Sequence, residues 1–359
     1  MKKNILLMLA ALPLFLGCRE ERPISFLSED FRTLEGERVF EDMFIGRPSR
    51  PLVIDSLLVF ADDHDGKLVT VLNLKTGEYH RALDRGRGPG ESIMVRRSSY
   101  DSEREEICLF DDAVKQMTFY STEVPFSELF SVQDITRRVD LHHADVPFEA
   151  VPFSGGYISN GNFDGRYQFS LLDSICEAVS RFGVYPGDKA ESGRGNAFFM
   201  KVQTIMAVNP DQSAFAAAGC NHDQLVFYRK DRSGEMRKVK EYFSLDSRVE
   251  VTVEKSGDMT RTHAAQTPET VFTYSSLYPT EDCLYASYSG LTVGEVMSAA
   301  KEGKTVGSGT RILKFDWDGN FIEGYMVGNI SDFAVDEPGG YLYAFGRKDG
   351  EQVLVRYSL

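Results

Sequence analysis

The chain has 359 residues, of which 42% are hydrophobic and 12% aromatic, enough apolar material for one large β domain or two ordinary domains. Its formal net charge of −14 repels the phosphates of nucleic acids, so we expect no nucleic-acid-binding role. The arginine pairs Arg85/Arg87 and Arg96/Arg97 are too small to form the basic patch that such a role requires.

The first 17 residues have the pattern of a secretory signal peptide. Two lysines precede an apolar run over residues 5–16, which is too short to span a membrane. The run ends in Leu16, Gly17 and Cys18, which resemble the lipobox of bacterial lipoproteins, although Phe15 stands where leucine is usual. The resemblance implies that Cys18 becomes the lipidated first residue and anchors the protein to a membrane by its acyl chains. A plain secreted protein is the alternative.

Two acidic residues, Glu20 and Glu21, follow Cys18 and resemble the surface-export signal of some Gram-negative lipoproteins. This resemblance implies a lipid anchor in the outer membrane, with exposure on the outer surface favoured over the periplasmic leaflet. The organisation we expect is a signal peptide at residues 1–17, a lipidated tether at residues 18–26 and one folded domain at residues 27–359.

A repeated pair of strands organises the folded domain. A leucine or an aromatic residue ends one strand of each copy, just before a turn, at Leu74, Tyr120, Leu172, Tyr228, Phe315 and Tyr357. Most intervals between copies are roughly 40–55 residues, a spacing typical of propeller blades. A short apolar strand precedes each position, so the pattern predicts an all-β, six-bladed β-propeller. An open stack of sheets or a sandwich is the alternative.

The predicted blades can be placed along the chain. They cover Pro51–Leu83, Ser98–Phe130, Phe148–Val184, Thr204–Phe243, Thr273–Val327 and Ile330–Leu359. The last blade ends after its third strand, so its fourth strand must come from elsewhere. Segment Arg38–Ile45 alternates suitably, and its pairing there would close the ring and cover an exposed edge. The Thr-rich segment Arg248–Pro268 predicts a hairpin that either extends a blade or leaves the ring.

The fifth copy is the clearest and contains an insertion. Residues 311–325 alternate with a period of two around a turn at Asp318-Gly319-Asn320. This turn begins like a calcium loop, but Val327 stands where the bidentate glutamate is expected, so a plain β-turn is predicted. Segment Leu291–Gly309 interrupts the copy and predicts a short helical insertion in blade five.

The loop between the first two blades is the best candidate for a feature beyond packing. Its sequence, Arg85 to Glu91, has three glycines at alternate positions and a proline, which force a compact irregular loop. It does not match the GxGxxG phosphate cradle. We expect Arg85, Arg87 and Glu91 to bind a ligand at one end of the ring, an end shared with Leu291–Gly309. The alternative is that the loop only turns the chain.

The hexapeptide GRGPGE, which follows a Lys-Thr-Gly-Glu turn in a chain with a lipobox, resembles the six-bladed β-propeller lipoproteins of the TolB-like group. Segment Phe182-Gly183-Val184-Tyr185-Pro186 resembles the segment between blades in that group. The resemblance covers nearly the whole mature chain and implies the fold. It says little about function, because many members have no assigned activity.

Motifs for catalysis or metal binding are weak. The chain has no G-x-S-x-G elbow and no CxxC pair, and none of its six histidines lies in a recognisable motif. Adjacent His142 and His143 would point to opposite faces of a strand, so we do not expect them to share a metal. The cluster Asp62–Asp65 is expected to be a solvated turn, with cation binding as the alternative. We expect free thiols at Cys108, Cys176, Cys220 and Cys283, with one disulfide left open.

These observations predict a non-enzymatic binding or adaptor module without a metal or other cofactor. Its partner would be an outer-membrane protein, a peptide or a glycan, recognised through one face of the ring. The alternative is a propeller hydrolase or lyase with a metal in the central channel, near Asn160, Asn221 and His222. A structural lipoprotein within an outer-membrane transport or assembly complex is a third possibility.

Overall fold

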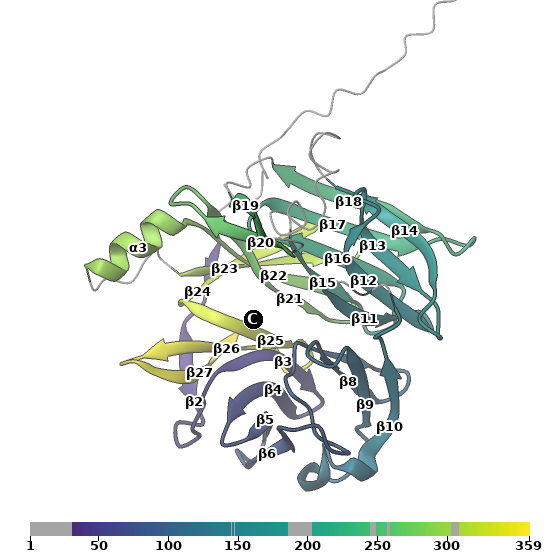
Figure 1. Cartoon of the computed structure of the whole chain (residues 1–359). Helices are drawn as coiled ribbons and strands as arrows, with labels where there is room; N and C mark the ends of the chain where they lie inside the picture. The colour runs from purple at the N-terminus through teal and green to yellow at the C-terminus, as the bar shows by residue number, and fades with distance from the viewer. Residues whose placement is uncertain are drawn as a thin grey trace, which may run out of the picture.

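The computed structural model describes residues 31–144, 146, 148–185, 203–244, 249–256, 259–302 and 309–359. The expected signal peptide and tether, including Cys18, lie outside these residues. Six antiparallel sheets are arranged radially around a central channel, as Figure 1 shows. The predicted all-β, six-bladed propeller is therefore confirmed.

Each blade runs from an inner strand at the channel to an outer strand at the rim. Blade one contains β3 (Pro48–Ile54), β4 (Leu57–His64), β5 (Lys67–Asn73) and β6 (Tyr79–Asp84), and blade two contains β7 (Arg97–Asp101), β8 (Glu106–Asp111), β9 (Gln116–Ser121) and β10 (Ile135–Asp140). Blade three contains β11 (Glu149–Phe153), β12 (Gly156–Phe163), β13 (Tyr167–Leu172) and β14 (Ala178–Val184), and blade four contains β15 (Thr204–Val208), β16 (Ala214–Gly219), β17 (Asp223–Lys230) and β18 (Met236–Ser244). Blade five contains β21 (Val271–Pro279), β22 (Cys283–Thr292), β23 (Thr310–Asp316) and β24 (Phe321–Val327), and blade six contains β25 (Ile330–Asp336), β26 (Tyr341–Lys348) and β27 (Glu351–Ser358).

The predicted repeat corresponds to one position in every blade. Five of its six marker residues lie in the third strand, and Leu74 comes directly after the third strand of blade one. One predicted boundary is wrong, because blade two extends beyond Phe130. Two short 3-10 turns, at Phe126–Glu128 and Val132–Asp134, separate β9 from its outer strand β10. The prediction stopped within this connection.

The N-terminal segment closes the ring. Strand β2 (Gly36–Val39) pairs antiparallel with β27, from Gly36 opposite Tyr357 to Val39 opposite Leu354. The predicted closing strand, Arg38–Ile45, is displaced, because Phe40 takes a positive φ of 53° and ends the ladder. Upstream, β1 (Arg32–Thr33) adds parallel to β24 of blade five. One short segment therefore holds the last two blades together.

Apolar clusters fill the space between neighbouring blades. Between blades three and four, Phe169, Phe182, Phe215 and Tyr228 pack with ring centroids 5.1–6.0 Å apart, mostly edge to face. Gly183 lies beside this cluster with a φ of 68°, and a Cβ there would lie 2.6 Å from the Phe169 ring. The residue must therefore be glycine for the two blades to approach.

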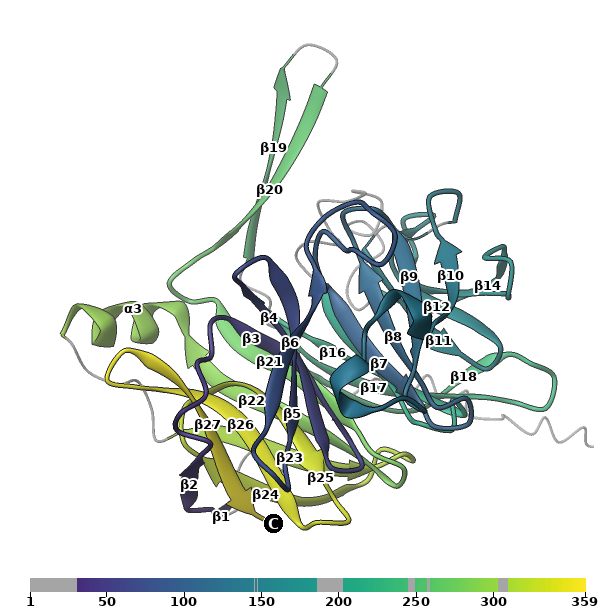
Figure 2. The same cartoon turned by 90° about the horizontal axis from the view of Figure 1, so that it is seen from below.

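Two insertions project from the ring. Helix α3 (Val293–Lys301) follows β22, begins with a Thr292–Glu295 capping box and buries none of its residues. Strands β19 (Val249–Ser256) and β20 (Met259–Gln266) form a separate hairpin that stands clear of the blades in Figure 2. The Thr-rich segment thus leaves the ring instead of extending a blade. Within the described ranges, no helix is long and apolar enough to cross a membrane.

Candidate functional site

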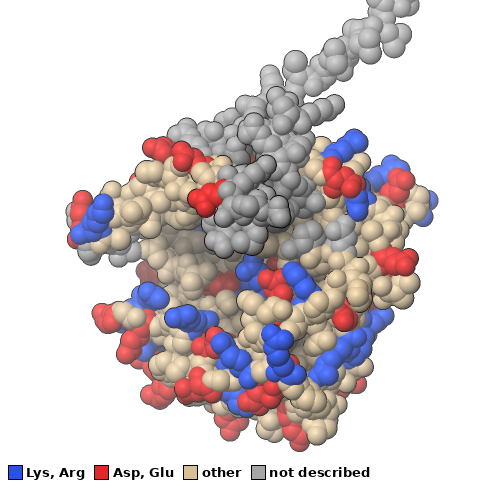
Figure 3. All heavy atoms as spheres, viewed as in Figure 1, with Lys and Arg blue, Asp and Glu red and all other residues tan. Residues whose placement is uncertain are grey.

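The channel has two ends, which differ in the loops that surround them. The inner-turn face is the end at which each inner strand turns into the second strand of its blade. The blade-link face is the opposite end, where the chain passes from blade to blade. Figure 3 views the blade-link face, from which the hairpin projects, and shows basic and acidic side chains interspersed there.

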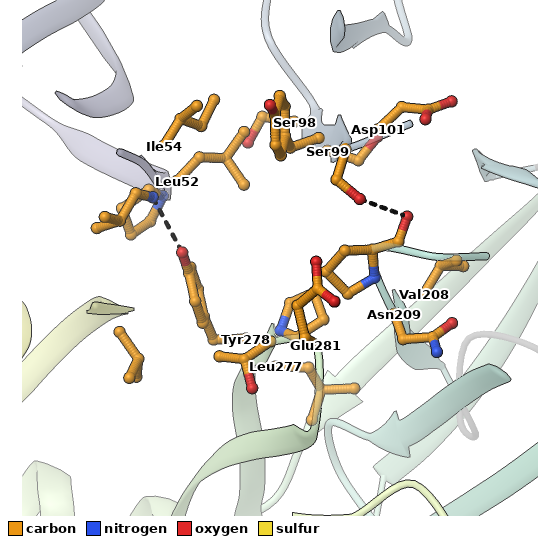
Figure 4. A pocket seen from close by; sticks show the side chains of 18 of the residues that line it. Leu52, Ile54, Ser98, Ser99, Asp101, Val208, Asn209, Leu277, Tyr278 and Glu281 are labelled. Atoms are coloured by element: carbon orange, nitrogen blue, oxygen red, sulfur yellow. Dashed lines mark hydrogen bonds between the residues drawn. The ribbon is translucent and has the colours of Figure 1, made fainter. Parts of the chain in front are cut away.

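A cavity of about 660 Å³ occupies the channel and reaches the inner-turn face. All six inner strands contribute to its wall, and the turns that follow five of them line its mouth at Asp55, Ser102, Asn209, Glu281 and Pro338. In Figure 4 the side chains of β3, β7, β15 and β21 surround one space. The volume is in the range typical of small-molecule and peptide pockets.

The middle of the cavity is mostly apolar. Leu52, Ile54, Val208 and Leu277 line it, and the Tyr278 hydroxyl accepts a hydrogen bond from the backbone N–H of Val53 at 2.9 Å. This bond joins the inner strands of blades five and one. The walls are therefore held by contacts between blades that are far apart in the sequence.

Two arginines line the inner end of the cavity. Arg50 lies at a bulge of β3 with a φ of 55°, and its backbone N–H donates to the Asp332 carboxylate at 2.8 Å. The Arg97 guanidinium reaches across the channel from blade two and donates to the backbone oxygen of Met206 in blade four. Burial lowers the pKa of Arg97, whereas the nearby carboxylate of Glu149 raises it.

These two guanidinium groups have few partners. Arg97 is only 9% exposed, yet its Nε has no hydrogen-bond partner in the described part of the chain. Neither arginine forms an ion pair with a described residue. Asp332 is close enough to raise the pKa of Arg97, but its oxygens accept from Arg50 N, from the Ser276 hydroxyl at 2.5 Å and from Phe333 N at 2.9 Å instead of from a guanidinium group. The inner end of the cavity thus holds two guanidinium groups whose N–H donors are only partly used within the described chain, with the carboxylates of Glu149 and Asp332 nearby.

The mouth of the cavity is acidic. Its carboxylates come from the turns and strand ends of blades one, two, five and six: Asp55, Asp101, Glu281, Asp282, Asp336 and Glu337. Of these, Asp101 accepts from Gln212 at 2.7 Å and Glu337 pairs with Lys314 at 3.3 Å. Asp55, Glu281 and Asp282 form no ion pair within the described ranges. Burial raises the pKa of Tyr100 at this mouth, and Asp55 raises it further.

The inner guanidinium groups and the acidic mouth are connected along one strand. Side chains two residues apart share a face of a strand, so Arg97, Ser99 and Asp101 project from the same side of β7, and all three line the cavity. Four residues of an extended strand span about 13 Å. The cavity therefore presents guanidinium donors at its inner end and carboxylates at its mouth within the length of a few peptide residues.

The predicted site residues lie on the opposite face. Arg85 pairs with Asp63, and the Glu91 carboxylate folds back to accept the Gly88 N–H at 2.6 Å. A Cβ on Gly86 would lie 1.9 Å from that carboxylate, so any larger residue there would displace the Glu91 side chain. Arg87 is exposed and forms no ion pair within the described part of the chain. The loop and α3 share the blade-link face but lie on opposite sides of blade six, and their described residues form no hydrogen bond or ion pair with one another.

Other expectations about polar clusters need correction. Asp62 was expected in a solvated turn, but it is fully buried and accepts the backbone N–H groups of Gly46 at 3.0 Å and Arg47 at 2.7 Å. His142 and His143 lie in a turn after β10 rather than on a strand. The predicted turn at Asp316–Asn320, in contrast, is confirmed, and the Asp316 carboxylate closes it by accepting from Asn320 N at 2.7 Å.

The residues proposed for a channel metal serve other contacts. Asn160 is buried and donates to the backbone oxygen of Thr204 at 3.0 Å, which joins blades three and four. His222 is buried, which lowers its pKa to about 4, and Asn221 accepts from Gln266 at 3.2 Å. In the described ranges, no three His, Cys, Asp or Glu side chains form a group that could hold a metal ion. Cys108, Cys176, Cys220 and Cys283 are free thiols.

Sequence reasoning missed the cavity residues, although a signal was present. Acidic residues end or follow the inner strand in four blades, at Asp55, Asp101, Glu281-Asp282 and Asp336-Glu337. This recurrence becomes visible only when the blades are aligned strand by strand.

A family model described as TolB-like 6-blade propeller-like matches residues 28–338. An exported protein from Bacteroides fragilis, as its description has it, shares 13% identity over 90% of this chain and 94% of its own, with a TM-score of 0.50. A member of the DUF4221 family from Bacteroides vulgatus shares 9% identity over 91% of this chain and 96% of its own, with a TM-score of 0.51. At such identities the likeness concerns the fold. No curated protein matches this sequence.

Proposed function

The chain belongs to the TolB-like six-bladed propeller family, and from that premise we propose that it is a non-enzymatic binding module that holds its ligand in the central cavity at the inner-turn face. One observation carries the proposal: all six inner strands line a cavity of about 660 Å³. The combination of apolar walls with a few convergent polar groups is typical of ligand sites.

The binding module is anchored in the cell envelope. The apolar run and the Leu16-Gly17-Cys18 lipobox support export and lipidation at Cys18, and one relative of similar fold is described as exported. The anchor places the domain on the outer membrane, where an outer-membrane protein, a peptide or a glycan can reach it. Exposure on the outer surface agrees with the acidic residues after Cys18.

The blade-link face is a second candidate, for docking of a membrane protein partner. Helix α3 has no buried residue, and its Met297 is 53% exposed. Arg87 stands on the same face without an ion pair among the described residues. If this face docks a partner, the Arg87→Ala change combined with deletion of Leu291–Gly309 abolishes co-purification of that partner from solubilised membranes. Unchanged co-purification would remove this face from the proposal.

The cavity is tested by filling it. Ser99 lies on its wall, so the indole of Ser99→Trp occupies the ligand space. The full-length lipoprotein in detergent is applied to immobilised peptide and glycan panels, with Ser127→Trp as the matched control because Ser127 is exposed at the rim of blade two. We expect Ser99→Trp alone to lose the ligands that the wild-type protein retains. Equal retention by both variants would contradict cavity binding.

A further inference from the structure

We propose that the cavity binds the C-terminal end of a short basic peptide, with the peptide carboxylate at Arg50 and Arg97 and a lysine or arginine side chain among the carboxylates of the mouth. This inference rests on the proposed function of the cavity and names its ligand class.

The peptide carboxylate would bind at the two arginines of the inner end. A buried guanidinium is costly without a partner, and Arg97 is 9% exposed with its Nε unpaired in the described chain. Glu149 is close enough to influence Arg97, but its Oε1 also lacks a hydrogen-bond partner there. Asp332 lies near Arg97 as well, but neither carboxylate forms an ion pair with Arg50 or Arg97 in the described chain, so free N–H donors of the two arginines remain available to an external anion. A carboxylate matches their planar donor geometry.

The acidic mouth of the cavity suits a basic side chain. Among the described residues, seven carboxylates and two guanidinium groups line the cavity, so this lining favours a ligand with positive charge. Asp55, Glu281 and Asp282 lie at the mouth without an ion pair in the described chain, and Figure 4 shows the Glu281 carboxylate directed toward the cavity. A lysine or arginine side chain placed there keeps its long stem on apolar wall and its charge near water.

The distance between the two ends of the cavity sets the length and the direction of the peptide. The inner cations and the acidic mouth are separated by about the 13 Å between Arg97 and Asp101 along β7. An extended chain advances roughly 3.3–3.6 Å per residue, so about three residues span this distance. Leu52 and Leu277 line the space between, which suits the intervening side chains. A free C-terminus inside and a basic side chain outside is therefore the orientation that satisfies both ends.

The test uses three tripeptides: Lys-Ala-Ala as the free acid, the same peptide as its C-terminal amide, and Glu-Ala-Ala. Binding to the full-length lipoprotein in detergent is measured by isothermal titration calorimetry. We expect amidation to weaken binding by about tenfold or more, because a hydrogen-bonded charge is lost. Arg50→Gln should weaken the free acid equally and leave the amide unchanged. Replacing Glu281 and Asp282 with Gln and Asn should weaken Lys-Ala-Ala by about three- to tenfold, with less effect at high salt.

Controls remove matched charges elsewhere. Arg138 is exposed on the outer strand of blade two and Glu351 is exposed at the start of β27, so Arg138→Gln and Glu351→Gln should bind as the wild type does. Equal affinity for the acid and the amide, tighter binding of Glu-Ala-Ala, or no binding of any tripeptide would overturn the ligand class. If Ser99→Trp nevertheless loses a different ligand from the panels, binding in the cavity is supported and only the proposed ligand class is wrong. If Ser99→Trp binds every ligand as the wild type does, the cavity function itself fails.

Discussion

The carboxylate of Asp332 accepts the backbone N–H of Arg50 at 2.8 Å, although the two residues are 282 positions apart. This bond joins the inner strand of blade six to that of blade one, across the seam where the ring closes. The other carboxylate oxygen accepts from Ser276 of blade five. One buried group therefore holds three inner strands and fixes the bulge that brings Arg50 to the cavity.

Replacement of Asp332 should weaken this seam. Asp332→Ala leaves the Arg50 N–H and the Ser276 hydroxyl without their acceptor, so we expect the free energy of unfolding to fall by about 2–4 kcal/mol. Urea denaturation measures the change. Asp318→Ala is the control, since its ion pair with Arg229 is exposed and contributes at most about 1 kcal/mol. Equal effects of the two changes would show that Asp332 stabilises the fold no more than an exposed ion pair does.

Ring closure by the N-terminal segment makes a second prediction. Deletion of residues 31–39 removes both β1 and β2, which exposes the edges of β24 and β27. We expect the free energy of unfolding to fall by at least about 3 kcal/mol and the protein to aggregate on mild heating. Thermal melting measures the first effect and light scattering the second. Glu37→Gln removes only the exposed pair with Arg356 and should change little. A deletion variant that melts as the wild type does would mean that the blades close without this segment.

His222 makes stability dependent on pH. Burial lowers its folded pKa to about 4, below the unfolded value of 6.5, so the unfolded chain binds a proton more readily between these values. The stability that depends on neutral His222 is fully present above pH 6.5. As the pH falls toward 4, the free energy of unfolding decreases by up to about 3 kcal/mol. His222→Gln should flatten the curve of unfolding free energy against pH, whereas the exposed His142→Gln should not. An unchanged curve in His222→Gln would assign the dependence to other groups.

The loop from Arg85 to Glu91 should behave as a locally braced turn. Glu91→Ala removes the acceptor of the Gly88 N–H, so we expect faster amide hydrogen exchange at residues 86–91. The free energy of unfolding should change by less than about 0.5 kcal/mol, because the group is exposed. Hydrogen-exchange mass spectrometry with urea denaturation separates the two effects. Unaltered exchange would show that glycine and proline geometry alone holds the loop.

The sequence allowed the blades to be predicted because each third strand repeats a local pattern, from Leu74 to Tyr357. The end of the closing strand was missed, since it depends on the backbone conformation of Phe40. The burial of Asp62 could not be predicted either, because it depends on backbone N–H groups of Gly46 and Arg47 that reach Asp62 only in the folded chain.

The cavity could not be predicted in the same way. Arg97 stands next to Arg96 in the sequence, and nothing in this local pattern shows that its side chain reaches Met206 across the channel. Arg50 owes its place to Asp332, far away in the sequence. Long-range contacts between blades therefore build the candidate site, whereas local patterns build the blades.

The measurement that tests the central claim most directly is the affinity of wild-type protein, Ser99→Trp and Ser127→Trp for the same ligand from the peptide and glycan panels. Cavity binding predicts a loss of at least about tenfold in Ser99→Trp, because the indole fills the ligand space, and no change in Ser127→Trp. Wild-type affinity in Ser99→Trp, confirmed as folded by its unfolding midpoint, would contradict the account.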